Sequence, residues 1–329
     1  MIIVKKTGLL IGCFVFAIMA TAQQTPQKFI QETQYLLYLP EDYAKDTTLK
    51  WPLMVFLHGS GESGVDLDKV KAHGPPKLIE AGKKFPFIVV SPQAPPQTGW
   101  KAEVIKGMID DIKKKYRVDN DRVYLTGLSM GGFGTWDLSE KYPDEFAAIA
   151  PICGGGDAEK TWKLRHMPVW CFHGAKDNVV PLASSQVMVD ALRKYNKDVK
   201  FTVYPDAEHN SWEVTYNNDS LYTWFLAQRK FRYKPVVVPE KILKEYEGFY
   251  TNVKRDTLQI VLENGKLIAK PGRNTIELKA SSETSFFWDP NSINEVQFLK
   301  DKMGTTTGLS ILTDEKEEAR KILIRKKTR

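Results

Sequence analysis

Apolar and polar positions divide the chain into two regions. Between about Thr33 and Gln228, short continuous apolar runs alternate with segments in which apolar residues recur at helical spacing. The expected strands are Tyr35–Leu39, Leu53–Leu57, Phe87–Val90, Val123–Leu125, Ala147–Ile152, Val169–Phe172 and Phe201–Tyr204. Continuous Val, Ile, Leu and Phe runs that alternate with helices indicate an α/β fold, with a mostly parallel sheet covered by helices on both faces.

Helical patterns follow several of these runs. They are Val104–Tyr116, Phe133–Lys141, a segment near Ser184–Tyr195, and a last helix that carries Leu221, Trp224 and Phe225. In open sheets of this kind, ligands bind beyond the carboxyl ends of the strands. Side chains in the loops that directly follow strands are therefore the first candidates for chemistry.

The second region begins at about Pro239 and has a different pattern. Short strand-like runs alternate with turn signals such as Glu263-Asn264-Gly265 and Pro271-Gly272. The runs are Thr257–Leu262, Lys266–Ala269, Thr275–Leu278, Ser285–Trp288, Val296–Leu299 and Ser310–Leu312. We therefore predict an α/β domain over residues 23–235 and a smaller antiparallel β domain over residues 240–329.

The N-terminus is typical of a secretory signal peptide covering residues 1–22. Lys5 and Lys6 precede an apolar run from Gly8 to Met19, which is followed by small residues ending at Ala22. The apolar run is too short to span a bilayer, so no stable membrane anchor is expected. We predict a periplasmic or secreted protein cleaved after Ala22; lipid attachment at Cys13, which lies inside the apolar run, is the alternative.

The charge pattern does not indicate nucleic-acid binding. The net charge is +7, but Lys and Arg are scattered, and the run Arg325–Arg329 supplies much of the excess. We interpret that run as a solvated tail. After signal cleavage only Cys153 and Cys171 remain; both a disulfide and two buried thiols are compatible with their positions.

A strained turn that carries a nucleophile is the clearest motif. Gly127-Leu128-Ser129-Met130-Gly131 has the pattern G-x-S-x-G, with a strand predicted directly before it and a helix directly after. The glycines are needed because side chains at those positions would crowd a tight strand-to-helix turn. The turn projects the Ser129 hydroxyl above the sheet, so Ser129 is the expected nucleophile.

A serine hydroxyl needs a base to remove its proton. His209 follows the last core strand, on the side of the sheet where Ser129 is expected, and is therefore the preferred base. His58 and His173 each begin a His-Gly turn at a strand end, which favours a loop-shaping function. His73 and His166 lie in loops that follow no predicted strand.

The base in turn needs a carboxylate to orient it and to stabilise the imidazolium. Asp177 follows the strand before the last and completes the order Ser, Asp, His that is expected of this arrangement. Asp206, Glu208 and Glu213 lie closer to His209 in the sequence. Closeness in sequence is weak support, because the three partners come from different loops, so Asp177 is preferred.

Acyl transfer also needs backbone donors for the developing oxyanion. We expect one from the amide of Met130 and one from the loop after Leu57, with Ser60 favoured over Gly59. Trp100, Trp162 and Trp212 lie in loops that border the expected cleft. They are candidates to stack on a sugar or phenolic ring of a substrate, and simple packing is the alternative for each.

Several segments occur together in an order that resembles a known group. They are His58-Gly59-Ser60-Gly61-Glu62, Leu128–Gly132, Tyr142–Phe146 and His173–Asp177. This set is similar to the phospholipase/carboxylesterase and feruloyl-esterase-like branch of the α/β hydrolases, including carbohydrate esterase family one. The resemblance implies a Ser129/His209/Asp177 triad, ester substrates, and neither metal nor cofactor. Tyr246–Tyr250 resembles part of the small β domain appended to some bacterial serine hydrolases.

These features predict an exported serine ester hydrolase. The sequence between Ile152 and Val169 holds no long apolar helical segment, so we expect no large cap, and an open site suits bulky or polymer-attached esters. Acetyl or feruloyl esters of plant polysaccharide fragments are the favoured substrates. Two alternatives stay open: a secreted serine peptidase of prolyl-oligopeptidase type, and a polysaccharide-binding protein whose hydrolase domain is vestigial.

Overall fold

The computed structural model describes residues 33–252, 257–313 and 320–325. The predicted signal peptide, with its cleavage site and Cys13, lies outside these residues, as does the end of the basic run from residue 326. Within the described ranges, no helix combines the length and apolar character needed to cross a membrane.

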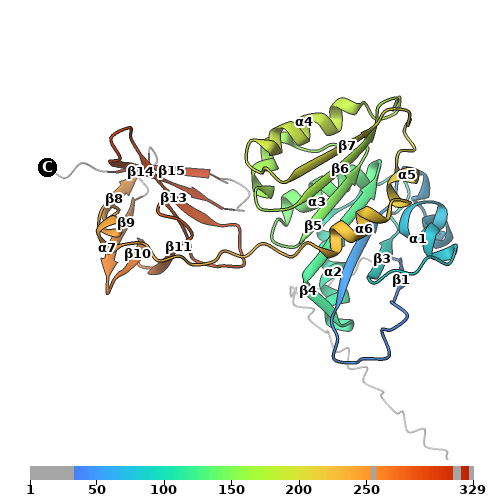
Figure 1. Cartoon of the computed structure of the whole chain (residues 1–329), viewed down its shortest axis with the longest axis horizontal. Coiled ribbons are helices and arrows are strands. Elements are labelled where there is room, and N and C mark those ends of the chain that lie inside the picture. Colours follow the sequence, from blue (N-terminus) through green and yellow to red (C-terminus); the bar gives the residue numbers. More distant parts are fainter. Residues whose placement is uncertain (1–32, 253–256, 314–319, 326–329) are drawn as a thin grey trace, which may run out of the picture. The chain divides into compact units, whose positions relative to one another are not determined.

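A seven-stranded sheet forms the first domain (Figure 1). The strand order is β1-β3-β2-β4-β5-β6-β7; β1 is antiparallel to β3, and the other neighbours pair in parallel. The strands are β1 (Tyr35–Tyr38), β2 (Trp51–Leu57), β3 (Ile88–Pro92), β4 (Val118–Leu128), β5 (Ala148–Ile152), β6 (Val169–Gly174) and β7 (Val199–Tyr204). The predicted mostly parallel sheet is confirmed.

The helices of this domain include segments that the sequence pattern did not indicate. The four predicted helices correspond to α2 (Ala102–Lys115), α3 (Met130–Lys141), α4 (Leu182–Arg193) and α6 (Asp219–Leu226). The additional helical segments are α1 (Gly74–Glu80), α5 (Trp212–Tyr216) and the 3₁₀ helices η1 (Ser60–Glu62), η2 (Leu67–Ala72) and η3 (Ala158–Leu164). These are short, and short helices give too few periodic positions for recognition.

Both faces of the sheet are buried, as the continuous apolar runs predict. Along β2, Leu53, Val55 and Leu57 pack into one core, whereas Met54 and Phe56 pack into the other. The first core includes side chains of α2, α3 and α4, and the second includes side chains of α5 and α6. Because successive side chains of a strand point to opposite faces, every residue of such a run is buried.

The connection between β5 and β6 is short. Its only helical element is η3, which has seven residues. The segment therefore contains no long helical insertion, as its sequence indicated.

The second domain is an antiparallel barrel of eight strands. The strands are β8 (Gly248–Thr251), β9 (Thr257–Glu263), β10 (Lys266–Pro271), β11 (Ile276–Ala280), β12 (Ser285–Phe287), β13 (Glu295–Lys300), β14 (Thr306–Leu312) and β15 (Arg320–Arg325), and α7 (Glu240–Lys244) precedes them. β8 and β15 were not predicted, and their pairing closes the barrel. Arg325 is the last residue of β15, so our interpretation of Arg325 as part of a solvated tail is wrong.

Aromatic side chains fill the barrel core. Tyr246, Tyr250, Phe286 and Phe298 are buried there, and the rings of Tyr246 and Phe298 stack with centroids 4.0 Å apart. The hydroxyl of Tyr250 donates to the carbonyl of Tyr246 at 2.7 Å. Packing thus explains the two tyrosines of the Tyr246–Tyr250 segment, whereas Phe249 is exposed.

Backbone contacts at the start of α3 are too close for any side chain. A Cβ on Gly131 would lie 1.9 Å from the carbonyl oxygen of Leu57, and a Cβ on Gly132 would lie 2.3 Å from that of Ile152. Since the neighbours are main-chain atoms of β2 and β5, they cannot rotate away. The glycines let α3 begin directly against the ends of these strands.

We predict that Gly131→Ala lowers the free energy of unfolding by about 3 kcal/mol or more, because the added methyl group displaces a strand from the helix. Gly107→Ala is the control, since Gly107 is an exposed residue of α2 and its Cβ would meet no atom within 4 Å. That change should stabilise the protein by about 0.5–1 kcal/mol. Chemical denaturation measures both, and an unchanged stability of Gly131→Ala would contradict the packing described.

Candidate active site

Ser129 occupies the turn between β4 and α3. Its backbone has φ 51° and ψ −117°, a conformation that non-glycine residues rarely adopt. The Ser129 N–H donates to the carbonyl of Ile152 at 3.0 Å, and its carbonyl accepts from Phe133 N–H at 3.0 Å. The neighbouring β5 and the first turn of α3 therefore hold the strained turn in place.

His209 joins the predicted nucleophile to the predicted carboxylate. It lies in the loop between β7 and α5, where its Nε2 is 3.0 Å from Ser129 Oγ and its Nδ1 is 2.8 Å from Asp177 Oδ2. The His209 side chain is 19% exposed, so a substrate can reach it from solvent. The structure thus brings together the three side chains that the sequence selected from separate loops.

Asp177 lies in the loop after β6, and its side chain is fully buried. Its Oδ1 accepts the N–H groups of Val179 and Val180, both at 2.9 Å. Burial raises the pKa of this carboxyl, but the His209 hydrogen bond and the two backbone N–H groups outweigh burial, so the net pKa lies below its ordinary value. Asp177 is therefore ionised at neutral pH.

The other carboxylates near His209 in sequence have different partners. Asp206 pairs with Lys176 Nζ at 2.8 Å. Glu213 accepts from Lys77 Nζ at 2.9 Å and lies 3.0 Å from His73 Nδ1. The contact between His73 and Glu213 was not foreseen, because the two residues are 140 positions apart and neither belongs to a recognisable motif.

The residues expected to stabilise an oxyanion stand at two helix starts. Met130 is the first residue of α3, and Ser60 is the first residue of η1. The first N–H groups of a helix have no acceptor within it and can donate to a ligand. The Ser60 loop lies beside the nucleophile, since a Cβ on Gly59 would be 3.7 Å from Ser129 Cβ.

His58 holds this loop, in agreement with a loop-shaping function. It is fully buried; its Nε2 accepts from Ala94 N–H at 3.0 Å, and its Nδ1 is 2.6 Å from the carbonyl oxygen of Gly59. Burial lowers the pKa of His58, although the Gly59 carbonyl and Glu62 act in the opposite direction.

The three tryptophans have different surroundings. Trp212 contacts the site directly, because its ring lies edge-on to His209 with centroids 5.1 Å apart and also contacts His73. Trp100 packs against Gly134 and donates from Nε1 to the carbonyl of His58 at 3.1 Å, so it supports the loop next to Ser129. Trp162 lies in η3, where the guanidinium carbon of Arg165 is 5.4 Å from the centroid of its ring.

Cys153 is a buried residue next to Asp177 and His209, and its thiol is unreactive. One potential ligand atom from each of Cys153, Asp177 and His209 lies within 4.8 Å of the other two. Among the described residues, this is the one group of three such side chains that could hold a metal ion. Burial raises the pKa of Cys153 to about 12, so the thiol stays protonated and is a weak ligand. Cys153 and Cys171 are both buried free thiols.

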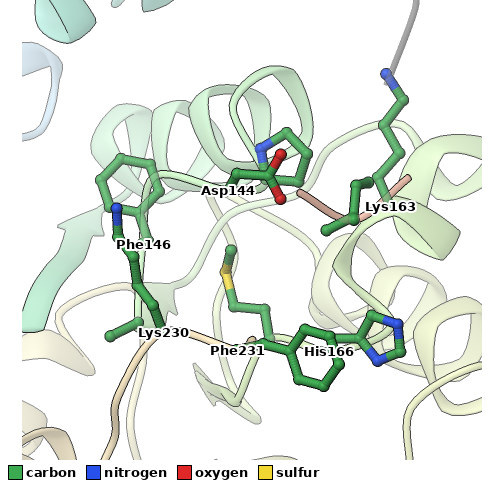
Figure 2. A pocket seen from close by; sticks show the side chains of 10 residues that line it. Asp144, Phe146, Lys163, His166, Lys230 and Phe231 are labelled. Atoms are coloured by element: carbon green, nitrogen blue, oxygen red, sulfur yellow. The ribbon is translucent and has the colours of Figure 1, made fainter. Parts of the chain in front are cut away.

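A separate small cavity is shown in Figure 2. It measures about 20 Å³, room for about one water molecule, and its lining includes Asp144, Lys163, His166, Lys230 and Phe231. The rings of His166 and Phe231 stack 4.0 Å apart. Burial lowers the pKa of Lys230 to about 8 and that of His166 to about 4. None of the predicted site residues lines this cavity.

Comparison with known proteins gives the class of the first domain. Residues 96–220 match the model of the dienelactone hydrolase family. A solved structure described as a thermostable esterase is 33% identical, with 60% of this chain and 59% of that chain covered, and has a TM-score of 0.52. The strand order, the turn at Ser129 and these matches confirm the predicted α/β-hydrolase fold, and the matched segment is similar to the dienelactone hydrolase family.

Two curated relatives are also similar. The bifunctional acetylxylan esterase/xylanase XynS20E of Neocallimastix patriciarum is 27% identical over 199 residues, which cover 57% of this chain and 27% of that protein. Poly(3-hydroxyalkanoate) depolymerase C of Paucimonas lemoignei is 37% identical over 123 residues, which cover 32% of this chain and 28% of that protein. The chain thus spans less than a third of the length of either relative.

Proposed function

We propose that this chain is a serine carboxylic ester hydrolase in which Ser129, His209 and Asp177 act as nucleophile, base and orienting carboxylate. The observation that carries the proposal is the double contact of His209, with Nε2 3.0 Å from Ser129 Oγ and Nδ1 2.8 Å from Asp177 Oδ2. Because Asp177 only accepts when ionised, Nδ1 carries the proton, and Nε2 is free to accept one from Ser129.

The first step is acylation of the serine. His209 Nε2 removes the proton as Ser129 Oγ attacks the ester carbonyl carbon, and the carbonyl electron pair moves onto oxygen. Backbone N–H groups of Met130 and Ser60 are the proposed donors to this oxyanion. When the carbonyl re-forms, the bond to the alcohol oxygen breaks, and the alcohol leaves with the proton held by His209.

The second step reverses these functions with water. His209 removes a proton from water, the hydroxide oxygen attacks the acyl carbon, and the bond to Ser129 Oγ breaks as the serine recovers its proton. Asp177 keeps its negative charge throughout and stabilises each imidazolium that forms. Its buried, fully hydrogen-bonded position suits that function because the carboxylate cannot rotate away.

For substrates we propose acetyl or feruloyl esters attached to plant polysaccharide fragments. A relative described as an acetylxylan esterase, the short β5–β6 connection, and an indole ring in contact with His209 support this class. The sequence of residues 1–22 supports export to the periplasm or outside the cell.

A substrate panel tests the function. We expect the wild type to hydrolyse aryl acetate and at least one of aryl butyrate, aryl ferulate and acetyl-xylan. Ser129→Ala should lower kcat by about 10⁵- to 10⁶-fold on the same esters. Ser139→Ala is the control, since its buried hydroxyl donates to Trp136 within α3. Absence of turnover of every ester by the wild type would refute the ester hydrolase. Turnover of the simple aryl esters without turnover of acetyl-xylan or aryl ferulate would refute only the substrate class.

A proline substitution tests the oxyanion donor. Ser60→Pro removes one backbone N–H at the first position of η1, where proline is tolerated, and Gly59 has ψ −179°, an extended conformation that suits a residue before proline. We expect kcat for an aryl ester to fall about 10²- to 10³-fold with little loss of stability. Ser60→Ala keeps the N–H and should retain activity; equal activity of the two variants would show that Ser60 donates nothing.

A further inference from the structure

A second imidazole contacts the carboxylate of Asp177. His173 is near the end of β6 and is fully buried. Its Nε2 lies 3.2 Å from Asp177 Oδ2, the oxygen that also contacts His209, and 2.9 Å from the carbonyl oxygen of Val180. Since the Val180 carbonyl only accepts, Nε2 carries a proton and donates it to Val180, and this N–H group lies against Asp177 Oδ2.

The other side of the His173 ring is held equally firmly. Its Nδ1 lies 2.7 Å from Ser185 Oγ, at the start of α4, and Ser185 Oγ lies 2.7 Å from the carbonyl oxygen of Gly154. A ring with partners at both nitrogens and no exposure has one orientation available. His173 is therefore a rigid link between the loop after β5, the loop after β6 and α4.

These contacts belong to a closed network of hydrogen bonds and polar contacts, called the circuit below, that includes the proposed nucleophile Ser129. Ser129 N–H donates to Ile152, two residues before Gly154, and Gly154 is joined through Ser185 to His173. His173 meets Asp177, Asp177 meets His209, and His209 returns to Ser129 Oγ. The Asp177 carboxylate is the point where this circuit passes between the two imidazoles.

We propose that His173 is a positioning residue of the triad. Through the 3.2 Å contact between its Nε2 and Oδ2, it holds the Asp177 carboxylate in the rotation at which the same oxygen accepts from His209 Nδ1. Its effect passes through Asp177, because a fully buried ring cannot touch a substrate. The inference rests on the proposed function, since it assigns His173 a part in the alignment of His209 and Ser129.

A purely structural function predicts something different. The contacts to Val180 and Ser185 would stabilise the loop without any need for the contact to Asp177. Loss of a structural contact lowers stability, whereas loss of the Asp177 contact lets the carboxylate rotate and misplaces His209. A misplacement of this kind lowers kcat and leaves KM largely unchanged.

Two substitutions separate the contacts. In His173→Asn the shorter amide can still reach Ser185 but ends short of Asp177, whereas in His173→Gln the longer amide can place an N–H near the position of Nε2. With p-nitrophenyl acetate, we expect His173→Asn to lower kcat by about 10- to 100-fold and to change KM less than about threefold. His173→Gln should recover most of that loss.

Asn196→Ala is the matched control for a buried polar loss. Asn196 is buried and donates to the carbonyls of Leu164 and Met167, away from the triad. It should lower the melting temperature and leave kcat unchanged. A kcat of His173→Asn equal to that of the wild type, or equal losses of kcat in the Asn and Gln variants, would overturn the positioning function of His173. The proposed ester hydrolase would still stand in that case, as long as the activity depends on Ser129.

A measurement without substrate tests the positioning function of His173 even if the protein hydrolyses no ester. The proton on His209 Nδ1 should give a low-field NMR signal that His209→Gln removes. We expect His173→Asn, and to a smaller extent Ser185→Ala, to shift or broaden that signal, and Asn196→Ala to leave it in place. An unchanged signal in His173→Asn overturns the positioning function even if the protein hydrolyses no ester, an outcome that would by itself refute the proposed function.

Discussion

The site depends on the close approach of backbone atoms where α3 begins. Gly131 and Gly132 leave no room for a Cβ against the ends of β2 and β5, and this contact lets the helix start immediately after β4. The chain can make so abrupt a change only if Ser129 takes a positive φ, which costs a non-glycine residue of order 1–3 kcal/mol. The surrounding hydrogen bonds offset that strain, and the hydroxyl is left beside the first N–H groups of α3.

The parallel sheet then brings the partners to the same edge. β4, β6 and β7 are close neighbours in the strand order, and the loops that follow them carry Ser129, Asp177 and His209. Sheet order alone gives only approximate closeness; hydrogen bonds supply the alignment. Asp177 accepts hydrogen bonds from Val179 and Val180 N–H, and its Oδ2 contacts both imidazoles, so the His209 ring that it contacts has little freedom.

The sequence indicated those features that local pattern encodes. The G-x-S-x-G turn predicted Ser129. Position directly after a strand selected His209 among the histidines, and it selected Asp177 over the carboxylates that lie closer to His209 in the sequence. Features that depend on pairing between distant segments were missed. The strand that ends at Arg325 looks like a charged tail in the sequence, because only its pairing with β8 shows that it belongs to the barrel. His173 was interpreted as loop-shaping because a His-Gly turn at a strand end does not reveal that its side chain meets Asp177.

The most direct test of this account is the site of covalent labelling by diisopropyl fluorophosphate, mapped by peptide mass spectrometry. An activated serine reacts with this reagent much faster than an ordinary hydroxyl because a neighbouring base removes its proton. We predict one adduct per chain, on Ser129, formed at least about 100-fold more slowly in His209→Gln. An adduct on a different residue, or equal rates in the two proteins, would contradict it.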